Sequence, residues 1–497
     1  MLSIENYDGL ELGRLIRTKE VQRKELVEAV IQRIEDKNPA INAVVNKMYE
    51  KALKTAEEPL TYGGKFAGVP TLMKDITQEI AGEPITSGSK AFSSYISERD
   101  SEYVKRVKET GAIIVGQTNV PELALMGVTE PQHHGATRNP WNVNHTPGGS
   151  SGGAAAVVAA GIVPFAGAND GGGSIRIPAA YCGLFGLKPT RGRTPVGPLY
   201  GRHWQGASVD HFITRSVRDS AAMLDELNVF EKTAAFHAPP YEGSYLQCAE
   251  SPTEQKLRIA FTVESPLGTE VHDDCKEAVL STVKLLEEMG HSVEEKTPDV
   301  NGKTIAKSYL TMYFGEVSAT LSSAESVLGR KISMSDVEPT TWLLRSLGKV
   351  TSAEEFVLSL REWDKAAFVM ESFHETYDLY ITPTTAFPPA KIGELDPSGF
   401  EKVMVKTIGR LGLSGLLKKT GFVDELAEKS LMRTPFTQLA NFTGQPAMSL
   451  PLYLSEEGLP CGVQVMAARG REDLLIEFAA GLEKTDRWID IKKSPLI

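Results

Sequence analysis

The sequence predicts an α/β protein in which one central mixed β-sheet is covered by helices. The first observation is that short apolar runs alternate with stretches of helical periodicity along the chain. The second is the succession of residues 257–263, 272–289 and 291–296, which have the patterns of a strand, a helix and a strand. The third is residues 354–376, a helical pattern that leads into the apolar run at 379–382.

The N-terminal part of the chain follows the same alternation. Residues 7–38 carry apolar side chains at helical spacing with charges on the opposite faces, which predicts surface helices that bury one stripe. Residues 66–73 read as a short buried strand with Lys74 at its end. A helix is expected over 101–110 and another buried strand over 112–116.

An uncharged stretch in the middle of the chain predicts a helix inside the core. The run AAAVVAAG after Gly153 has high helix propensity and no polar face. Residues 162–166, which follow this helix, can form a strand.

We expect the whole chain, residues 1–497, to form a single domain. No internal repeat is visible. Residues 236–252, rich in Pro, Ser and Glu, are the one candidate linker, and a surface loop is the alternative for them. Residues 385–432 look least like sheet and are expected to be a helical insertion that covers the substrate. Within them, 402–422 combine five basic residues with interleaved apolar ones. A membrane-surface helix and a pocket cover both remain open for that segment.

Composition excludes several classes of function. Lys and Arg number 53 against 64 Asp and Glu, a net charge of −11, so nucleic-acid binding through bulk charge is not expected. We expect no secretory signal and no membrane span, because the start lacks an apolar region and no long apolar run occurs. The four cysteines form no C-x-x-C pair, which removes zinc and redox motifs and favours a reduced, cytoplasmic location.

Two glycine–serine segments carry the chemistry. The first is GGSSGG at residues 148–153, and the second is DGGGSIRIPA at 170–179. Glycines let a backbone fold tightly and expose its N–H groups, which suits an oxyanion site. A flexible linker fits poorly because both segments adjoin buried apolar runs. A phosphate cradle and a G-x-S-x-G elbow are not matched.

Nucleophilic catalysis by a serine remains, and it needs a base. A neutral buried lysine can serve. Lys74 follows an apolar strand, which favours that role, but a plain surface lysine stays open from the residues alone.

Together these segments closely resemble the amidase signature family. The resemblance extends over GVPTLMKD, GAIIVGQTNVPE, CGLFGLKPTRG and GLPCGVQVMA, in order, along almost the whole chain. It implies that Ser174 is the nucleophile, Ser150 a bridging serine after a cis peptide bond, and Lys74 the base. It also implies an oxyanion hole of backbone N–H groups from Gly171, Gly172, Gly173 and Ser174. The family commonly has Thr or a similar residue at the position of Gly171, so we expect a looser loop here.

Other residues receive supporting roles. Asp170 and Arg176 flank the nucleophile and are expected to hold its loop by charge-assisted bonds. Leu125 and Met126 are expected to line an apolar substrate pocket.

We therefore interpret the sequence as that of an amidohydrolase of small-molecule amides that works through an acyl-enzyme. We expect no metal or cofactor and no nucleic-acid or membrane partner. The block VTEPQHHGATRNPWN resembles those of hydrolases of linear or cyclic oligoamides and of general bacterial amidases. The alternative is the glutaminase subunit of an aminoacyl-tRNA amidotransferase, which would feed ammonia to a partner. A homodimer stays open, because the sequence does not determine the oligomeric state.

Overall fold

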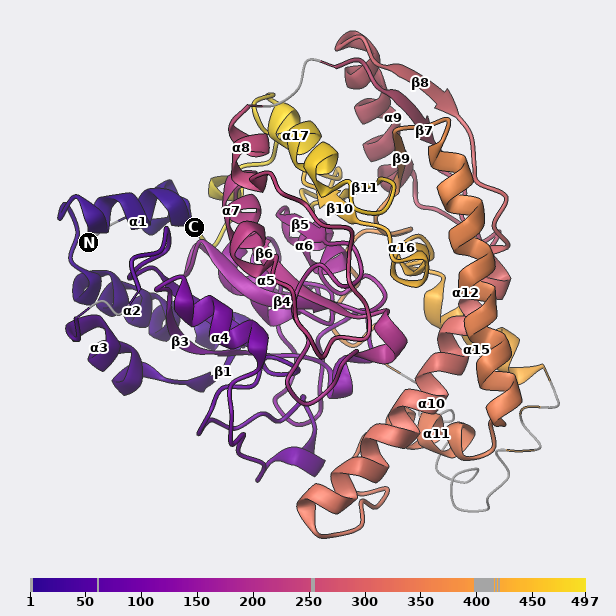
Figure 1. The fold of residues 1–497 in the computed structure, drawn as a ribbon, viewed down its shortest axis with the longest axis horizontal. Coiled ribbons are helices and arrows are strands. Elements are labelled where there is room, and N and C mark those ends of the chain that lie inside the picture. Colours follow the sequence, from indigo (N-terminus) through magenta and orange to yellow (C-terminus); the bar gives the residue numbers. More distant parts are fainter. Residues whose placement is uncertain (1–2, 60–61, 252–254, 397–414, 416–417, 419–420) are drawn as a thin grey trace.

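The computed structural model describes residues 3–59, 62–251, 255–396, 415, 418 and 421–497. Within them the strands form two sheets (Figure 1). The strands are β1 Val44–Lys47, β2 Pro70–Lys74, β3 Ile113–Thr118, β4 Phe165–Asp170, β5 Phe185–Lys188, β6 Val209–Thr214, β7 Arg258–Phe261, β8 Ser292–Glu295, β9 Leu379–Pro383, β10 Ala447–Leu450 and β11 Val463–Met466.

The helices surround these sheets. They are α1 Gly9–Arg17, α2 Arg23–Ile41, α3 Tyr49–Glu57, α4 Glu102–Glu109, α5 Gly152–Ala159, α6 Arg176–Cys182, α7 Val217–Leu227, α8 Tyr245–Glu250, α9 Asp273–Glu288, α10 Gly302–Leu328, α11 Pro339–Lys349, α12 Ala353–His374, α15 Phe422–Leu431, α16 Gln438–Thr443 and α17 Glu472–Glu483. None of the helices in these described ranges is long and apolar enough to cross a membrane.

The larger sheet has eight strands in the order β4-β6-β5-β10-β11-β9-β7-β8. Its pairs are antiparallel from β4 to β9, and β7 pairs in parallel with both β9 and β8. The predicted α/β class with a central mixed sheet covered by helices is therefore confirmed. A second sheet of three strands, β1-β3-β2, was not predicted.

The small sheet meets the large one beside β2 and β4. The hydroxyl of Thr71 in β2 donates to the carbonyl of Phe165 in β4 at 3.0 Å, and Gln78 after β2 donates to the carbonyl of Ala168 at 3.0 Å. The ends of these two strands, at Lys74 and Asp170, consequently lie near each other. This junction is where the candidate site forms.

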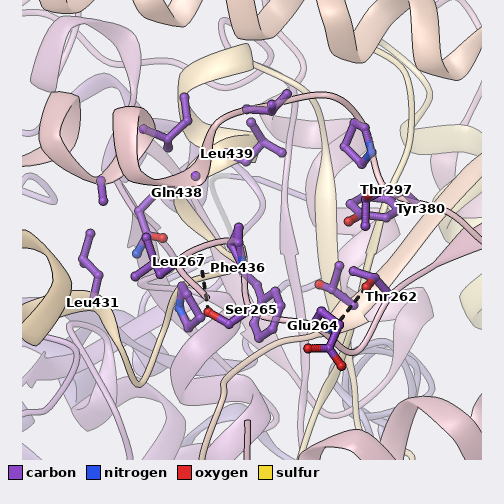
Figure 2. Close-up of a pocket in the computed structure, with 18 residues that line it drawn as sticks. Thr262, Glu264, Ser265, Leu267, Thr297, Tyr380, Leu431, Phe436, Gln438 and Leu439 are labelled. Atoms are coloured by element: carbon purple, nitrogen blue, oxygen red, sulfur yellow. Dashed lines mark hydrogen bonds between the residues drawn. The ribbon is translucent and has the colours of Figure 1, made fainter. Parts of the chain in front are cut away.

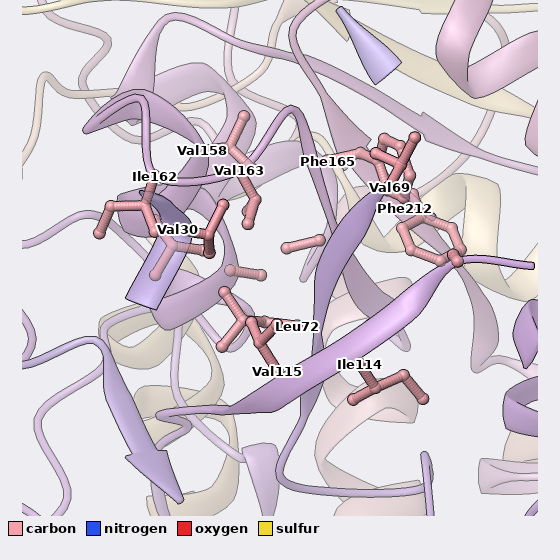
Figure 3. Close-up of a cluster of buried hydrophobic side chains, with 14 of the residues drawn as sticks. Val30, Val69, Leu72, Ile114, Val115, Val158, Ile162, Val163, Phe165 and Phe212 are labelled. Carbon is pink, nitrogen blue, oxygen red and sulfur yellow. The ribbon is translucent and has the colours of Figure 1, made fainter. Parts of the chain in front are cut away.

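The core at this junction is made by both sheets and the helix between them. Figure 3 shows Val30 of α2, Leu72 of β2, Val115 of β3, Val158 of α5 and Phe165 of β4 in one buried cluster. Every residue of α5 is buried, as its uncharged sequence predicts. The cluster anchors α5 and both strands, so the loops that leave them start from fixed points.

Local signals explain several boundaries. The side chain of Ser101 accepts a hydrogen bond from Val104 N–H at the start of α4, and Gly111 just beyond its end has φ +82°. Helix α12 begins with a capping box formed by Ser352 and Glu355. These helices match the predicted ranges to within a few residues.

Other boundaries differ from expectation. The strand predicted at 66–73 starts only at Pro70, because the preceding residues turn at Gly68, which has φ +85°. The strand predicted at 162–166 begins at Phe165 and continues to Asp170.

The prediction of a linker at 236–252 is wrong. It contains α8, whose Tyr245 is wholly buried against the core. Of the helical insertion predicted at 385–432, α15 is described and packs Val423, Ala427 and Leu431 against α10. Most of the basic segment at 402–422 lies outside the described residues.

Candidate active site

Lys74 lies at the end of β2 with its whole side chain buried. Its Nζ is 2.8 Å from Ser150 Oγ and 2.6 Å from Asn169 Oδ1. The carbonyl oxygen of Asn169 lies 3.4 Å away. The surface-lysine alternative is therefore wrong, and the amine is directed at the first glycine–serine segment.

The environment of Lys74 favours its neutral form. Burial lowers the pKa of the amine from 10.5 to about 7, although the carboxylates of Asp210 and Asp170 act in the opposite direction. A lysine with this pKa is substantially neutral near pH 7 and has a lone pair that can accept a proton.

The first glycine–serine segment enters α5 through a cis peptide bond between Gly149 and Ser150. A Cβ on Gly149 would lie 2.7 Å from the carbonyl oxygen of Met126 and 2.8 Å from backbone atoms of Val128, so only glycine fits there. Ser150 is fully buried, and its hydroxyl contacts Lys74.

The second segment forms a tight loop between β4 and α6. A side chain on Gly171 would meet the ring of Trp204, and one on Gly172 would overlap the hydroxyl of Tyr309. Trp204 thus occupies the space that a larger residue at position 171 would need. Gly173 has φ +127°, a conformation that strongly favours glycine.

Ser174 is half-buried, whereas its neighbours in the loop are buried. Its carbonyl accepts a hydrogen bond from Ser151 N–H at 3.3 Å, which holds the two segments side by side. In the described part of the chain, the Ser174 hydroxyl has no hydrogen-bond partner, and none joins it to Ser150. The structure therefore brings Lys74 and Ser150 into direct contact and places Ser174 on the adjoining loop.

The backbone N–H groups of this loop divide into two sets. The N–H of Gly173, which we expected in the oxyanion hole, donates to Asp170 Oδ1 at 2.7 Å. For the N–H groups of Gly171, Gly172 and Ser174, the described residues provide no acceptor. These three N–H groups therefore remain candidates for the expected oxyanion hole.

Asp170 and Arg176 form the buried support of the loop. Arg176 Nη2 lies 2.9 Å from Asp170 Oδ1 and its Nε lies 3.0 Å from Oδ2, with both side chains wholly inaccessible. Burial alone would raise the pKa of Asp170, but the charge and hydrogen bonds of Arg176 outweigh it and hold that pKa well below its usual range.

Arg176 also reaches the C-terminal part of the chain. It donates to the carbonyl of Thr437 at 2.9 Å, to Gln464 Oε1 at 2.7 Å and to Asn441 Oδ1 at 2.7 Å. The predicted supporting role of Asp170 and Arg176 agrees with these contacts, whereas these three partners were not foreseen.

Comparison of the sequence with known protein families agrees with this arrangement of Lys74, Ser150 and the Ser174 loop. A family model described as amidase matches residues 25–476. The chain belongs to the amidase signature family. It is a hydrolase that acts on amide C–N bonds.

Relatives of the amidase cover its full length. A 6-aminohexanoate-cyclic-dimer hydrolase of Paenarthrobacter ureafaciens is 36% identical over 490 residues, 97% of this chain and 95% of that protein. A solved structure of a 6-aminohexanoate cyclic dimer hydrolase superposes with a TM-score of 0.89 at 34% identity, covering 100% of both chains. That hydrolase has also been solved in complex with substrate. A bacterial aryl acylamidase of the same family gives 0.83 at 26% identity, over 99% and 98% of the two chains.

The two residues predicted to bind substrate differ in exposure in the amidase. Leu125 is buried and belongs to the same large apolar cluster as Tyr309 and Tyr313. Met126 is 40% exposed, and its carbonyl borders Gly149. Trp204 and Tyr309 lie against Gly171 and Gly172, and with Tyr313 they form an aromatic wall beside the loop that sequence reasoning did not anticipate.

A cavity of about 300 Å³ lies between the start of α10, at Ile305 and Ala306, and the start of α16, at Gln438 and Leu439 (Figure 2). Its lining is mainly apolar and includes Leu267 and Leu431. Phe436 and Gln438 also line it, and they flank Thr437, whose hydroxyl donates to the carbonyl of Gly172 at 2.6 Å. The cavity adjoins the loop, but Lys74, Ser150 and Ser174 do not line it.

Sequence reasoning missed Asn169, the nearest neighbour of the Lys74 amine. It stands directly before Asp170 in β4, where strand alternation gives no hint of a functional side chain. In the described residues, no three His, Cys, Asp or Glu side chains gather as a metal-binding group would.

Proposed function

We propose that this amidase cleaves apolar linear, cyclic or aryl amides through an acyl-enzyme on Ser174, with Ser150 and Lys74 as a proton relay. The observation that carries the proposal is the buried Lys74 amine, 2.8 Å from the Ser150 hydroxyl and with a pKa lowered to about 7 by burial. An ammonium could not accept a proton, whereas this amine can.

In the first half of the reaction, Ser174 Oγ forms a bond to the carbonyl carbon of the substrate. Its proton passes to Ser150 Oγ as the Ser150 proton passes to Lys74 Nζ. The negative charge that develops on the carbonyl oxygen is stabilised by the N–H groups of Gly171, Gly172 and Ser174. Each such donor typically contributes about 10²–10³ in rate.

In the second half, the C–N bond breaks and the leaving nitrogen takes the proton back from Lys74 through Ser150. The acyl group stays on Ser174 as an ester. A water molecule then attacks this ester and loses its proton along the same relay, which returns free Ser174 and the carboxylic acid. No further reactant is needed for the balance of atoms.

The preference for apolar amides is supported by the wall around the loop. Trp204 and Tyr309 lie against Gly171 and Gly172, and Trp204 and Tyr313 meet edge to face at 4.9 Å. Leu125 belongs to the same apolar cluster as these residues. Glutamine would bring an ammonium and a carboxylate to this wall, and burying unpaired charges is costly. An aliphatic or aryl acyl group has no such cost.

The test is to assay the purified chain alone on acetamide, hexanamide, an anilide, a cyclic oligoamide and glutamine, with Ser174→Ala as the blank. We expect the highest kcat/KM for an aliphatic, aryl or cyclic substrate and little turnover of glutamine. If glutamine is the best substrate, and only when amidotransferase partner subunits are added, the glutaminase alternative replaces this proposal.

A further inference from the structure

Three oxygen atoms surround the amine of Lys74, and two of them belong to Asn169. The distances from Nζ are 2.6 Å to Asn169 Oδ1, 3.4 Å to the Asn169 carbonyl and 2.8 Å to Ser150 Oγ. A neutral amine has two hydrogens and one lone pair. Both oxygens of Asn169 can only accept hydrogen bonds, whereas the hydroxyl of Ser150 can also donate. With both hydrogens on Asn169, the lone pair is left facing Ser150.

This arrangement requires that Oδ1 of the Asn169 amide, and not Nδ2, faces Lys74. The contact of Nδ2 with Thr77 determines this orientation. Asn169 Nδ2 donates to Thr77 Oγ1 at 2.7 Å. The Thr77 hydroxyl donates in turn to Asp210 Oδ1 at 3.0 Å, the same oxygen that accepts a hydrogen bond from Gln78 Nε2. A reversed amide would place an NH₂ donor against Lys74, and that donor would compete with Ser150 for the lone pair.

A second path closes the network around Lys74. Gln78 Nε2 donates to Asp210 Oδ1 at 3.1 Å, while Gln78 Oε1 accepts from the backbone N–H of Lys74 at 2.7 Å. Lys74, Asn169, Thr77, Asp210 and Gln78 thus form a closed ring of hydrogen bonds between β2, β4 and β6. A ring of this kind restricts the rotation of the Asn169 side chain.

We propose that Asn169 is a positioning residue that holds the hydrogens of the Lys74 amine and so directs its lone pair at Ser150, with Thr77 and Asp210 fixing the orientation of the amide. The inference rests on the proposed relay, because it assigns Asn169 a role only through Lys74.

Among the described residues, few charged groups lie near the Lys74 amine, so a shift of its pKa can be assigned to a single substitution. Asp210 faces it from β6, and Asp170 faces it from the end of β4, where Arg176 neutralises it. Asp75, next in the chain, instead accepts hydrogen bonds from Thr86. Asn169 is uncharged, so a carboxylate introduced there would add one new charge next to the amine.

The first pair of variants is Asn169→Leu and Asn169→Asp, each measured for kcat and KM over pH 5–10. Asn169→Leu removes the acceptor, and we expect kcat to fall about 100-fold with KM nearly unchanged. Asn169→Asp keeps an acceptor but stabilises the ammonium, so the ascending limb of the pH profile should move up by about one unit or more. A purely structural role would lower the rate without moving the limb.

The second pair is Thr77→Val and Thr77→Ser, which decides the question if the Asn169 variants fail to fold. Thr77→Val keeps the shape and removes the hydroxyl that links Asn169 to Asp210, so kcat should fall about tenfold. Thr77→Ser keeps the hydroxyl and should restore most of that loss. Equal activity of the two Thr77 variants would overturn the role of Thr77 and Asp210.

Labelling of Ser174 by a fluorophosphonate separates this inference from the proposed function. If the wild-type chain is not labelled at Ser174, the proposed function itself fails. If the wild type is labelled, and the Asn169 variants are labelled at wild-type rates with an unshifted pH profile, the relay stands and the positioning role of Asn169 is wrong.

Discussion

Arg176 and Asp170 form a bidentate ion pair with no solvent access, and this pair sits under the loop that carries Ser174. Asp170 also accepts hydrogen bonds from the backbone N–H groups of Gly173 and Ile175, at 2.7 and 3.1 Å. The carboxylate therefore connects the guanidinium to the backbone of the loop. Removing either partner leaves a buried charge without compensation.

Arg176→Met should accordingly destabilise the protein by about 3–5 kcal/mol, the usual effect of breaking a buried ion pair. Urea unfolding followed by circular dichroism would measure it. Arg14→Met is the matched control, because Arg14 pairs with Glu11 at the surface, where the two side chains are 45% and 31% exposed. That control should cost no more than about 1 kcal/mol. Equal losses would show that burial does not decide the effect.

Ser174→Ala should abolish amide hydrolysis, a loss on the order of 10⁶ in kcat, and leave the unfolding midpoint nearly unchanged. The reason is that the Ser174 hydroxyl makes no hydrogen bond in the described structure, so few stabilising contacts disappear. Kinetics and thermal unfolding on the same preparation would check both parts. A fluorophosphonate that labels another serine, with Ser174 untouched, would contradict the assignment.

Ser150→Ala and Lys74→Ala should each lower kcat by several orders of magnitude, and the double variant should be little worse than either single one. The two side chains contact each other at 2.8 Å and would act as one relay, so their losses should not multiply. Steady-state kinetics of the three variants gives the comparison. A double variant whose loss equals the product of the single losses would mean that they act independently.

The rate should depend on pH through Lys74. The folded pKa is about 7 and the neutral amine is the active form, so kcat/KM should rise as the pH increases through about 7 and level off above it. A pH–rate profile measured with an uncharged amide, which does not titrate itself, would check this. An optimum below about pH 5 would exclude a lysine base.

Lengthening an aliphatic acyl group should raise kcat/KM about fourfold per methylene, because each buried methylene contributes about 0.8 kcal/mol. The series acetamide, butanamide and hexanamide would give the slope. Leu125→Ser replaces part of the apolar wall and should flatten that slope. An unchanged slope in Leu125→Ser would remove Leu125 from the acyl-binding surface.

Much of the framework could be predicted from local pattern. Helices α4, α9 and α12 follow from periodicity and capping residues, and α5 follows from its lack of any polar residue. The positions of Lys74 and Ser150 were predicted by resemblance, and the structure places them in contact. The three-stranded sheet was missed, because short apolar strands do not reveal which partners they pair with.

The polar surroundings of the site could not be predicted. Asn169 and Thr77 lie 92 residues apart, and Asp210 belongs to a third strand, so no spacing in the sequence links them. The N–H of Gly173 was expected to be an oxyanion donor, but it donates a hydrogen bond to the carboxylate of Asp170. Such contacts depend on side-chain orientation in the finished fold, which residue types alone do not determine.

The contacts of Arg176 bear on how the protein is made. Thr437, Asn441 and Gln464, which accept hydrogen bonds from its guanidinium, leave the ribosome at least 261 residues after Arg176. A nascent chain in which Lys74, Ser150 and Ser174 have already emerged still lacks these acceptors. The loop of Ser174 reaches its final support only after the C-terminal part of the chain has docked, so a prematurely terminated chain would carry all three residues without a completed site.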